Sequence, residues 1–156
     1  MVNVSVIGGS QVSDEICDVA IEVGRLLAKR GATVFCGGLD GVMKCVSKGV
    51  KMEGGIAVGI LPGYKADEGN EYLTVKIPTG MGYARNFLVV RAGDVIIAID
   101  GSTGTLSEAS FAIAEGKDVV AIGDIVINPK KEKEGKFFKA RTPQEAVDLA
   151  FSRLGK

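Results

Sequence analysis

The sequence predicts a three-layer α/β fold, in which a doubly wound and mostly parallel sheet carries helices on both faces. Short β-branched runs that are apolar at nearly every position alternate with longer segments of helical period. Strands covered on both faces by crossover helices have this uniformly apolar character. Glycine-rich turns follow several of these strands, as expected where a strand passes into a helix.

Each element of this fold has a local sequence signal. Residues 2–7 and 94–99 are apolar or small almost throughout, as in strands at the middle of a sheet. From 14 to 30 apolar residues recur on one helical face, and Gly31 is typical of a helix end. In chain order, we expect strands at 2–7, 32–36, 56–61, 72–77, 94–99 and 119–122, and helices at 14–30, 42–51, 83–92 and 105–115.

The last part of the chain has a different pattern. Residues 125–127 and 137–139 have the composition of edge strands, and they flank a charged run that we expect to be a solvated turn. The final helix begins at Thr142, because Pro143 suits its first position and Glu145 completes a T-x-x-E capping box.

The composition excludes several classes of function. The 156 residues include 19 basic and 19 acidic side chains and no histidine. A balanced charge argues against a nucleic-acid or membrane-surface partner. The missing histidine excludes Ser-His-Asp triads, Cys-His pairs and HExxH zinc sites. We therefore expect no metal site, no nucleic-acid partner and no membrane partner.

The cysteines and the N-terminus indicate the compartment. Cys17, Cys36 and Cys45 are odd in number and form no CxxC motif, so we expect thiols rather than a disulfide. The N-terminus lacks the pattern of a signal peptide, and no apolar run approaches the ~20 residues that span a bilayer. These features predict a cytoplasmic protein.

The chain contains 22 glycines. Some of them directly follow four predicted strands, in the segments 8–9, 37–38, 80–82 and 101–104. Ligands of doubly wound sheets bind outside the carboxyl ends of the strands. Glycine loops there present backbone amides and helix N-termini, which suit a phosphate or another anion. Gly8, Gly9 and Ser10 match only a fragment of the dinucleotide-binding motif, and a tight turn explains them equally well.

Two further segments carry candidate functional groups. Residues 101–108, G-S-T-G-T-L-S-E, follow the most apolar strand. Thr105 and Glu108 form a T-x-x-E box there, and the same groups can also face a ligand. Arg85 lies in G-M-G-Y-A-R-N, at the start of an otherwise apolar helix. It is either a surface or salt-bridged arginine, or it binds an anion or orients Glu108.

Together, G-S-T-G-T-L-S-E and M-G-Y-A-R-N resemble the LOG-like, "possible lysine decarboxylase" superfamily. The turn G-G-x-x-G-V-M at 37–43 and the strand end I-L-P-G at 60–63 support the resemblance, which covers about residues 3–122. Within the superfamily, the chain is most similar to the small branch that includes the molybdenum-cofactor carrier proteins.

The resemblance implies a single Rossmann-like nucleotide-binding domain over residues 1–156 and a homodimer or homotetramer. It implies a phosphoribohydrolase acting on nucleoside 5′-monophosphates, and no lysine decarboxylase activity. By position, Glu108 and Arg85 match the catalytic residues. The residues expected to bind the phosphorylated ligand are Gly8, Gly9, Ser10, Gly37, Gly38, Asn86, Gly101, Ser102, Thr103, Gly104 and Thr105.

Asp100, Ser102 and Asn86 replace the proline, second glycine and lysine of the family motif. In an enzyme, Glu108 is expected to stay ionised near the helix N-terminus and to stabilise an oxocarbenium-like transition state. That enzyme requires no cofactor, and it has no histidine to protonate the leaving base. Because of the replacements, the alternative is a non-catalytic protein that binds molybdenum cofactor or a related phosphorylated cofactor. A structural oligomerisation domain is the third hypothesis.

Overall fold

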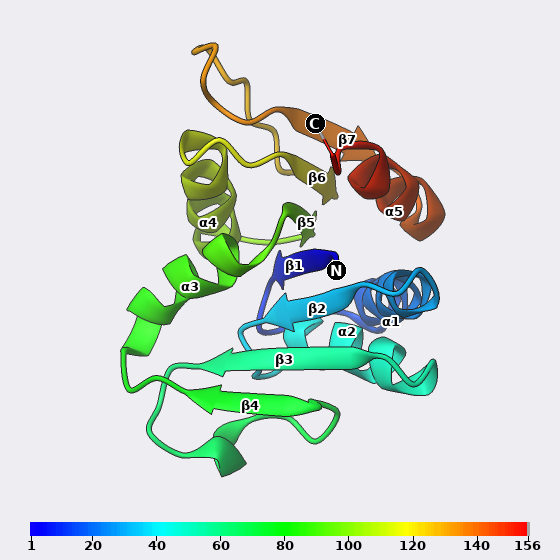
Figure 1. Cartoon of the computed structure of the whole chain (residues 1–156), viewed down its shortest axis with the longest axis vertical. Helices are drawn as coiled ribbons and strands as arrows, with labels where there is room; N and C mark the ends of the chain where they lie inside the picture. The colour runs from blue at the N-terminus through cyan, green and yellow to red at the C-terminus, as the bar shows by residue number, and fades with distance from the viewer. Residues whose placement is uncertain (156) are drawn as a thin grey trace.

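A seven-stranded parallel sheet forms the centre of the computed structural model, which describes residues 1–155 (Figure 1). The strand order is β4-β3-β2-β1-β5-β6-β7, and every neighbouring pair is parallel. The order reverses between β1 and β5, as in a doubly wound sheet. The strands are β1 (Asn3–Gly8), β2 (Thr33–Cys36), β3 (Ile56–Leu61), β4 (Val75–Pro78), β5 (Val95–Ile99), β6 (Val119–Ile122) and β7 (Phe137–Ala140).

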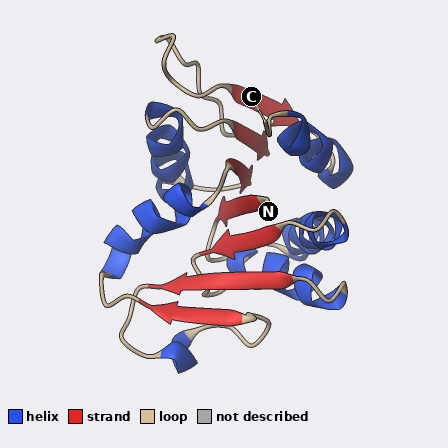
Figure 2. Ribbon diagram, viewed as in Figure 1, coloured by secondary structure: helices blue, strands red, loops and turns tan. Residues whose placement is uncertain are grey.

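Helices cover both faces of the sheet (Figure 2). On one face, α1 (Asp14–Lys29), α2 (Val42–Met52) and α5 (Pro143–Ser152) bury one apolar cluster against the strands. On the other face, α3 (Arg85–Ala92) and α4 (Thr103–Ala114) bury a second cluster. Short 3₁₀ turns occupy Ala66–Glu68 and Gly82–Ala84. This arrangement confirms the predicted three-layer, Rossmann-like α/β fold.

The α1–α2 contact depends on two glycines within the helices. A Cβ atom on Gly24 would overlap the backbone carbonyl of Val46, and one on Gly49 would overlap that of Ile21. The two backbones therefore approach more closely than any other residue type would allow. Gly24 and Gly49 therefore serve helix packing and are not among the glycines that follow the predicted strands.

A disulfide joins Cys17 in α1 to Cys45 in α2. The expectation of three thiols is therefore wrong for this pair, and it holds for Cys36, which is buried and free. The close packing of α1 on α2 brings the two Cα atoms to 5.4 Å, within the range that a disulfide spans. A separation of 28 residues leaves no local motif that could indicate this pairing.

Two predicted strands differ from the structure. The strand expected at 72–77 is Val75–Pro78, because Asn70 is tied to the β2–α2 connection by bonds to Gly38 and Leu39. Residues 125–127 form no strand. The Lys139 ammonium donates hydrogen bonds to the carbonyls of Gly123 and Ile125. These bonds replace the backbone hydrogen bonds that a strand at 125–127 would form with a neighbouring strand.

The final helix is confirmed, since Thr142 caps it by accepting the amide of Glu145 at 3.1 Å and Pro143 occupies its first turn. Among the helices of residues 1–155, none is both long and apolar enough to cross a membrane.

Candidate functional site

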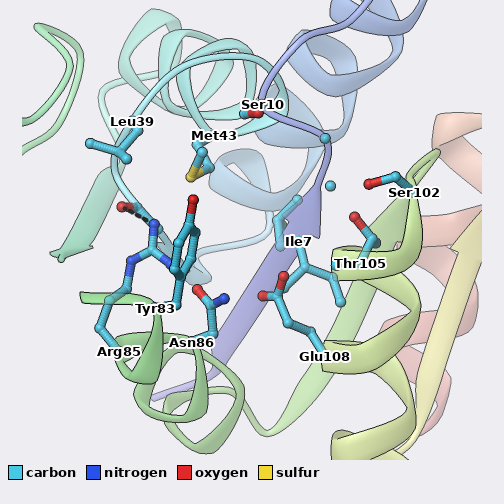
Figure 3. A pocket seen from close by; sticks show the side chains of 15 residues that line it. Ile7, Ser10, Leu39, Met43, Tyr83, Arg85, Asn86, Ser102, Thr105 and Glu108 are labelled. Atoms are coloured by element: carbon cyan, nitrogen blue, oxygen red, sulfur yellow. Dashed lines mark hydrogen bonds between the residues drawn. The ribbon is translucent and has the colours of Figure 1, made fainter. Parts of the chain in front are cut away.

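A pocket of about 410 Å³ opens at the carboxyl ends of the strands, beside the β1–β5 reversal (Figure 3). We call it the rim pocket. Four segments meet there, namely the end of β1, the β2–α2 connection, the start of α3 and the start of α4. Its lining residues are Val6, Ile7, Gly8, Gly9, Ser10, Gly37, Leu39, Met43, Tyr83, Arg85, Asn86, Ser102, Gly104, Thr105 and Glu108.

Most residues singled out from the sequence therefore lie together. Three of them do not line the rim pocket. Gly38 lies against the side chains of Leu61 and Leu73. Gly101 and Thr103 line two neighbouring hollows at the N-terminus of α4.

Arg85 is the first residue of α3, and only 5% of it is exposed. Its Nη2 donates to the Gly37 carbonyl at 3.4 Å, whereas its Nε has no hydrogen-bond partner. Within residues 1–155 no carboxylate lies within 4 Å of it. Burial lowers the pKa of the guanidinium, and the negative charge of Glu108 opposes this shift. Arg85 is therefore neither a surface arginine nor half of an ion pair.

Gly37 makes room for this arginine. A Cβ atom at position 37 would lie 2.6 Å from the Met43 sulfur and 2.8 Å from Arg85 Nη2. Any side chain at this position would force the guanidinium away from the carbonyl that it contacts. Gly37, directly after β2, thus allows Arg85 to occupy this position.

Glu108 lies half-buried on the opposite wall, in the second turn of α4. Burial raises the pKa of its carboxyl to about 7, and the charge of Arg85 offsets only part of this rise. A carboxyl with a pKa of about 7 is only partly ionised at neutral pH, so burial opposes the expected effect of the helix N-terminus on Glu108. Helix-terminus effects fade within the first turn, and Glu108 is the sixth residue of its helix.

The T-x-x-E capping box expected at Thr105 is also absent. The helix begins two residues earlier, with Ser102 as its N-cap, and the Ser102 hydroxyl makes no capping bond. Thr105 is buried within the first turn. The first amides of α4 consequently have no partner within the helix, and Gly104 and Thr105 present this end of the helix to the rim pocket.

Several residues that line the rim pocket were not predicted from the sequence. Leu39 and Met43 from the β2–α2 segment form an apolar wall. Tyr83 stands at the mouth with 89% of its surface exposed. The position of Tyr83 two residues before Arg85, within the recognised G-M-G-Y-A-R-N segment, was the available signal for it.

These groups define what the rim pocket can do chemically. A buried cation and the amide end of a helix favour an anion. A carboxyl group with a pKa near 7 can hold or release a proton at neutral pH. Among residues 1–155, no three histidine, cysteine or acidic side chains gather as a potential metal site.

The fold and the pocket define a Rossmann-like protein whose strands end at a cavity lined by glycines and by both polar and apolar side chains. More particularly, the chain belongs to the SLOG cluster4 family, whose sequence profile matches residues 1–147. An uncharacterized protein of Archaeoglobus fulgidus is 38% identical over 153 residues, which is 97% of this chain and 96% of that protein.

The chain is also similar to several solved structures. TM1055, a structural-genomics target, is 37% identical, with a TM-score of 0.89 over 97% of this chain and 99% of that one. The molybdenum cofactor binding protein from Rippkaea orientalis is 29% identical, with a TM-score of 0.88 over 97% of this chain and 96% of that one. The molybdenum cofactor carrier protein from Chlamydomonas reinhardtii is 26% identical, with a TM-score of 0.87 over the full length of both chains. The expected similarity to the molybdenum-cofactor carrier proteins is confirmed.

Proposed function

We propose that this protein binds and carries a phosphorylated cofactor of the molybdenum-cofactor type in the rim pocket. The observation that carries the proposal is Arg85, a buried cation that lines the pocket with its Nε unpartnered. A buried charge is costly unless it is paired and hydrogen-bonded. An anionic group on the ligand would complete this site.

The residues of the pocket fit such a group. The amides at the start of α4 and the hydroxyls of Ser102 and Thr105 would bind phosphate oxygens. The Arg85 guanidinium would bind the same anion from the opposite wall. When bound, the cofactor would supply a redox-active metal to an acceptor protein, while this chain would contribute the binding of its phosphate. The similarity to the molybdenum cofactor binding protein of Rippkaea orientalis and to the carrier protein of Chlamydomonas reinhardtii supports this ligand class.

Calorimetry with purified protein tests the proposal. Molybdopterin and guanosine 5′-monophosphate serve as probes, and the variant is Arg85→Met. We expect binding by the wild-type chain and at least a ten-fold loss in the variant, because a charge-assisted contact to phosphate is removed. Arg141→Met is the matched control, since the Arg141 side chain is 91% exposed and lies far from the pocket along the chain. No binding of either probe to the wild-type chain would refute the proposal.

A second candidate function is the phosphoribohydrolase reaction. One observation favours it, namely the pKa of about 7 at Glu108. Hydrolysis joins the hydroxyl of water to the anomeric carbon and breaks the bond from that carbon to the base. A protonated Glu108 would give its proton to the departing base and take one back from the attacking water. This role would supply the donor that a chain without histidine otherwise lacks. Incubation with a panel of nucleoside 5′-monophosphates should release free base and ribose 5-phosphate, and Glu108→Gln should abolish the release.

We also infer a homodimer or homotetramer. Val75 and Ile77 lie on one face of the edge strand β4 and are 43% and 44% exposed, and exposed apolar side chains close together favour association. Sedimentation velocity measures the assembled mass directly, and a monomer at micromolar concentration would contradict this inference. Location in the cytoplasm stays a prediction.

A further inference from the structure

A second cavity of about 290 Å³ lies between α3 and α4 and adjoins the rim pocket. Its walls are mainly apolar and aromatic, formed by Tyr83, Phe87, Val90 and Phe111, and Glu108 reaches it from α4. We call this cavity the ring subsite. Its volume is near the lower end of the roughly 300–1,000 Å³ of small-molecule sites, so it suits part of a ligand.

The aromatic groups of the ring subsite are already arranged for stacking. The ring centroids of Phe87 and Phe111 lie 4.6 Å apart at an interplanar angle of 55°. Arg91 lies over the Phe111 ring, 5.5 Å from its centroid. Val90 is fully buried, whereas Phe87 keeps 49% of its surface exposed. A second flat ring would cover the exposed Phe87 surface and gain stacking contacts.

The ring subsite is continuous with the rim pocket. Tyr83, Asn86, Gly104 and Glu108 line both cavities. Asn86 offers an amide donor and an acceptor, and Glu108 offers a carboxyl group, which together match the N–H and C=O edges of a nitrogen heterocycle. A ligand with its phosphate at α4 and Arg85 would therefore extend past these two polar side chains.

We propose that the ring subsite receives the fused nitrogen heterocycle of the bound cofactor. The heterocycle would stack on Phe87 and form hydrogen bonds through its polar edge to Asn86 and Glu108. This inference rests on the proposed binding function and narrows it to phosphorylated compounds that bear a flat heteroaromatic ring. Purine nucleotides and pterin phosphates share this chemistry. Their relative affinities for the wild-type chain identify which ring is preferred.

Calorimetry with three probes separates the ring from the phosphate. The probes are guanosine 5′-monophosphate, molybdopterin and the ringless ribose 5-phosphate. In Phe87→Ala, we expect affinity for the better ring-bearing probe to fall about ten-fold, because stacking on an aromatic side chain is lost. Affinity for ribose 5-phosphate should not change. Leu106→Ala is the matched control, since Leu106 is an exposed apolar residue of α4 that faces a different hollow.

A fluorescence experiment gives an independent readout. The chain contains no tryptophan, so Phe87→Trp places a single indole at the ring subsite. Its emission should be quenched by the ring-bearing probe and not by ribose 5-phosphate, because only a stacked ring contacts the indole.

Two results would overturn the ring subsite alone. Wild-type binding that Phe87→Ala leaves unchanged would show that the phosphate site works without it. A fall in assembled mass in Phe87→Ala, with affinity unchanged, would assign this face to a second copy of the chain. Failure of all three probes to bind the wild-type chain would instead refute the proposed function, and the ring subsite with it.

Discussion

Arg85 and Glu108 face each other across the rim pocket and do not form an ion pair (Figure 3). Among residues 1–155, none of the ion pairs within 4 Å includes either side chain. Burial lowers the pKa of Arg85 and raises the pKa of Glu108, so it favours the neutral form of each side chain. The opposite charge of the other side chain offsets only part of each shift. The pocket therefore holds two incompletely compensated ionisable groups on opposite walls.

Glu108→Gln should make the protein more stable at alkaline pH. The pKa of Glu108 in the folded state, about 7, lies above its ordinary value of 4.5, so the folded state holds this proton more tightly than the unfolded state. The contribution of Glu108 to the free energy of unfolding is therefore greatest below pH 4.5 and falls as the pH rises through about 7.

The measurement is urea denaturation of the wild-type chain and Glu108→Gln between pH 5 and pH 8. The variant should gain up to about 3 kcal/mol relative to the wild-type chain across this range, at about 1.4 kcal/mol per pKa unit. Glu132→Gln, at an exposed position, is the control. A pH-independent difference between Glu108→Gln and the wild-type chain would contradict the assigned ionisation.

Arg85→Met should not destabilise the ligand-free protein. The burial cost of the guanidinium is offset in this state by a single hydrogen bond of 3.4 Å. Replacement of buried charges by apolar side chains of similar size is often neutral or stabilising. We expect the free energy of unfolding in urea to stay level or rise by about 1 kcal/mol. A loss above about 2 kcal/mol would identify Arg85 as a structural residue.

Cys17→Ser should destabilise the oxidised protein by about 3 kcal/mol, because the disulfide restricts a loop of the unfolded chain. The difference in stability should disappear in dithiothreitol, because the reduced wild-type chain and the variant both lack the disulfide. Thiol titration of the denatured wild-type chain should count one reactive group, Cys36. A count of three in protein purified without reductant would contradict the disulfide.

Gly49→Ala should lower the free energy of unfolding by about 1–3 kcal/mol, because its methyl group would overlap the carbonyl of Ile21. Gly104→Ala is the matched helical glycine, and nothing lies within 4 Å of its Cβ position. Alanine there should raise the free energy by about 0.5–1 kcal/mol, as helix propensity predicts. Equal effects of the two substitutions would mean that α1 and α2 can separate without cost.

Much of this fold could be predicted because its signals are local. The uniformly apolar runs at 2–7 and 94–99 became β1 and β5, and the helical pattern before Gly31 became α1. The errors arose where a distant group determined the local structure. Lys139 binds the carbonyls near Ile125, and Cys17 meets Cys45 only after α1 packs on α2. The spacing of residues along the sequence predicts neither contact.

Most of the residues that the motifs indicated line one pocket, whereas the electrostatics of that pocket could not be predicted. Arg85, Asn86 and Glu108 line one pocket as the motifs indicated. The ionisation of Glu108 depends on how deeply α3 and the β1 end bury it, which no motif encodes. Phe111 had no sequence signal as a site residue, because its role beside Phe87 exists only once α3 packs on α4.

The reversal of strand order between β1 and β5 divides the sheet into two halves, and the rim pocket takes a wall from each. Leu39 and Met43 belong to the half that contains β1 to β4, whereas Thr105 and Glu108 belong to the half that contains β5 to β7. A molecule bound to both walls would link the two halves non-covalently. Occupancy of the pocket would then slow amide hydrogen exchange on both sides of the junction, far beyond the residues that touch the ligand.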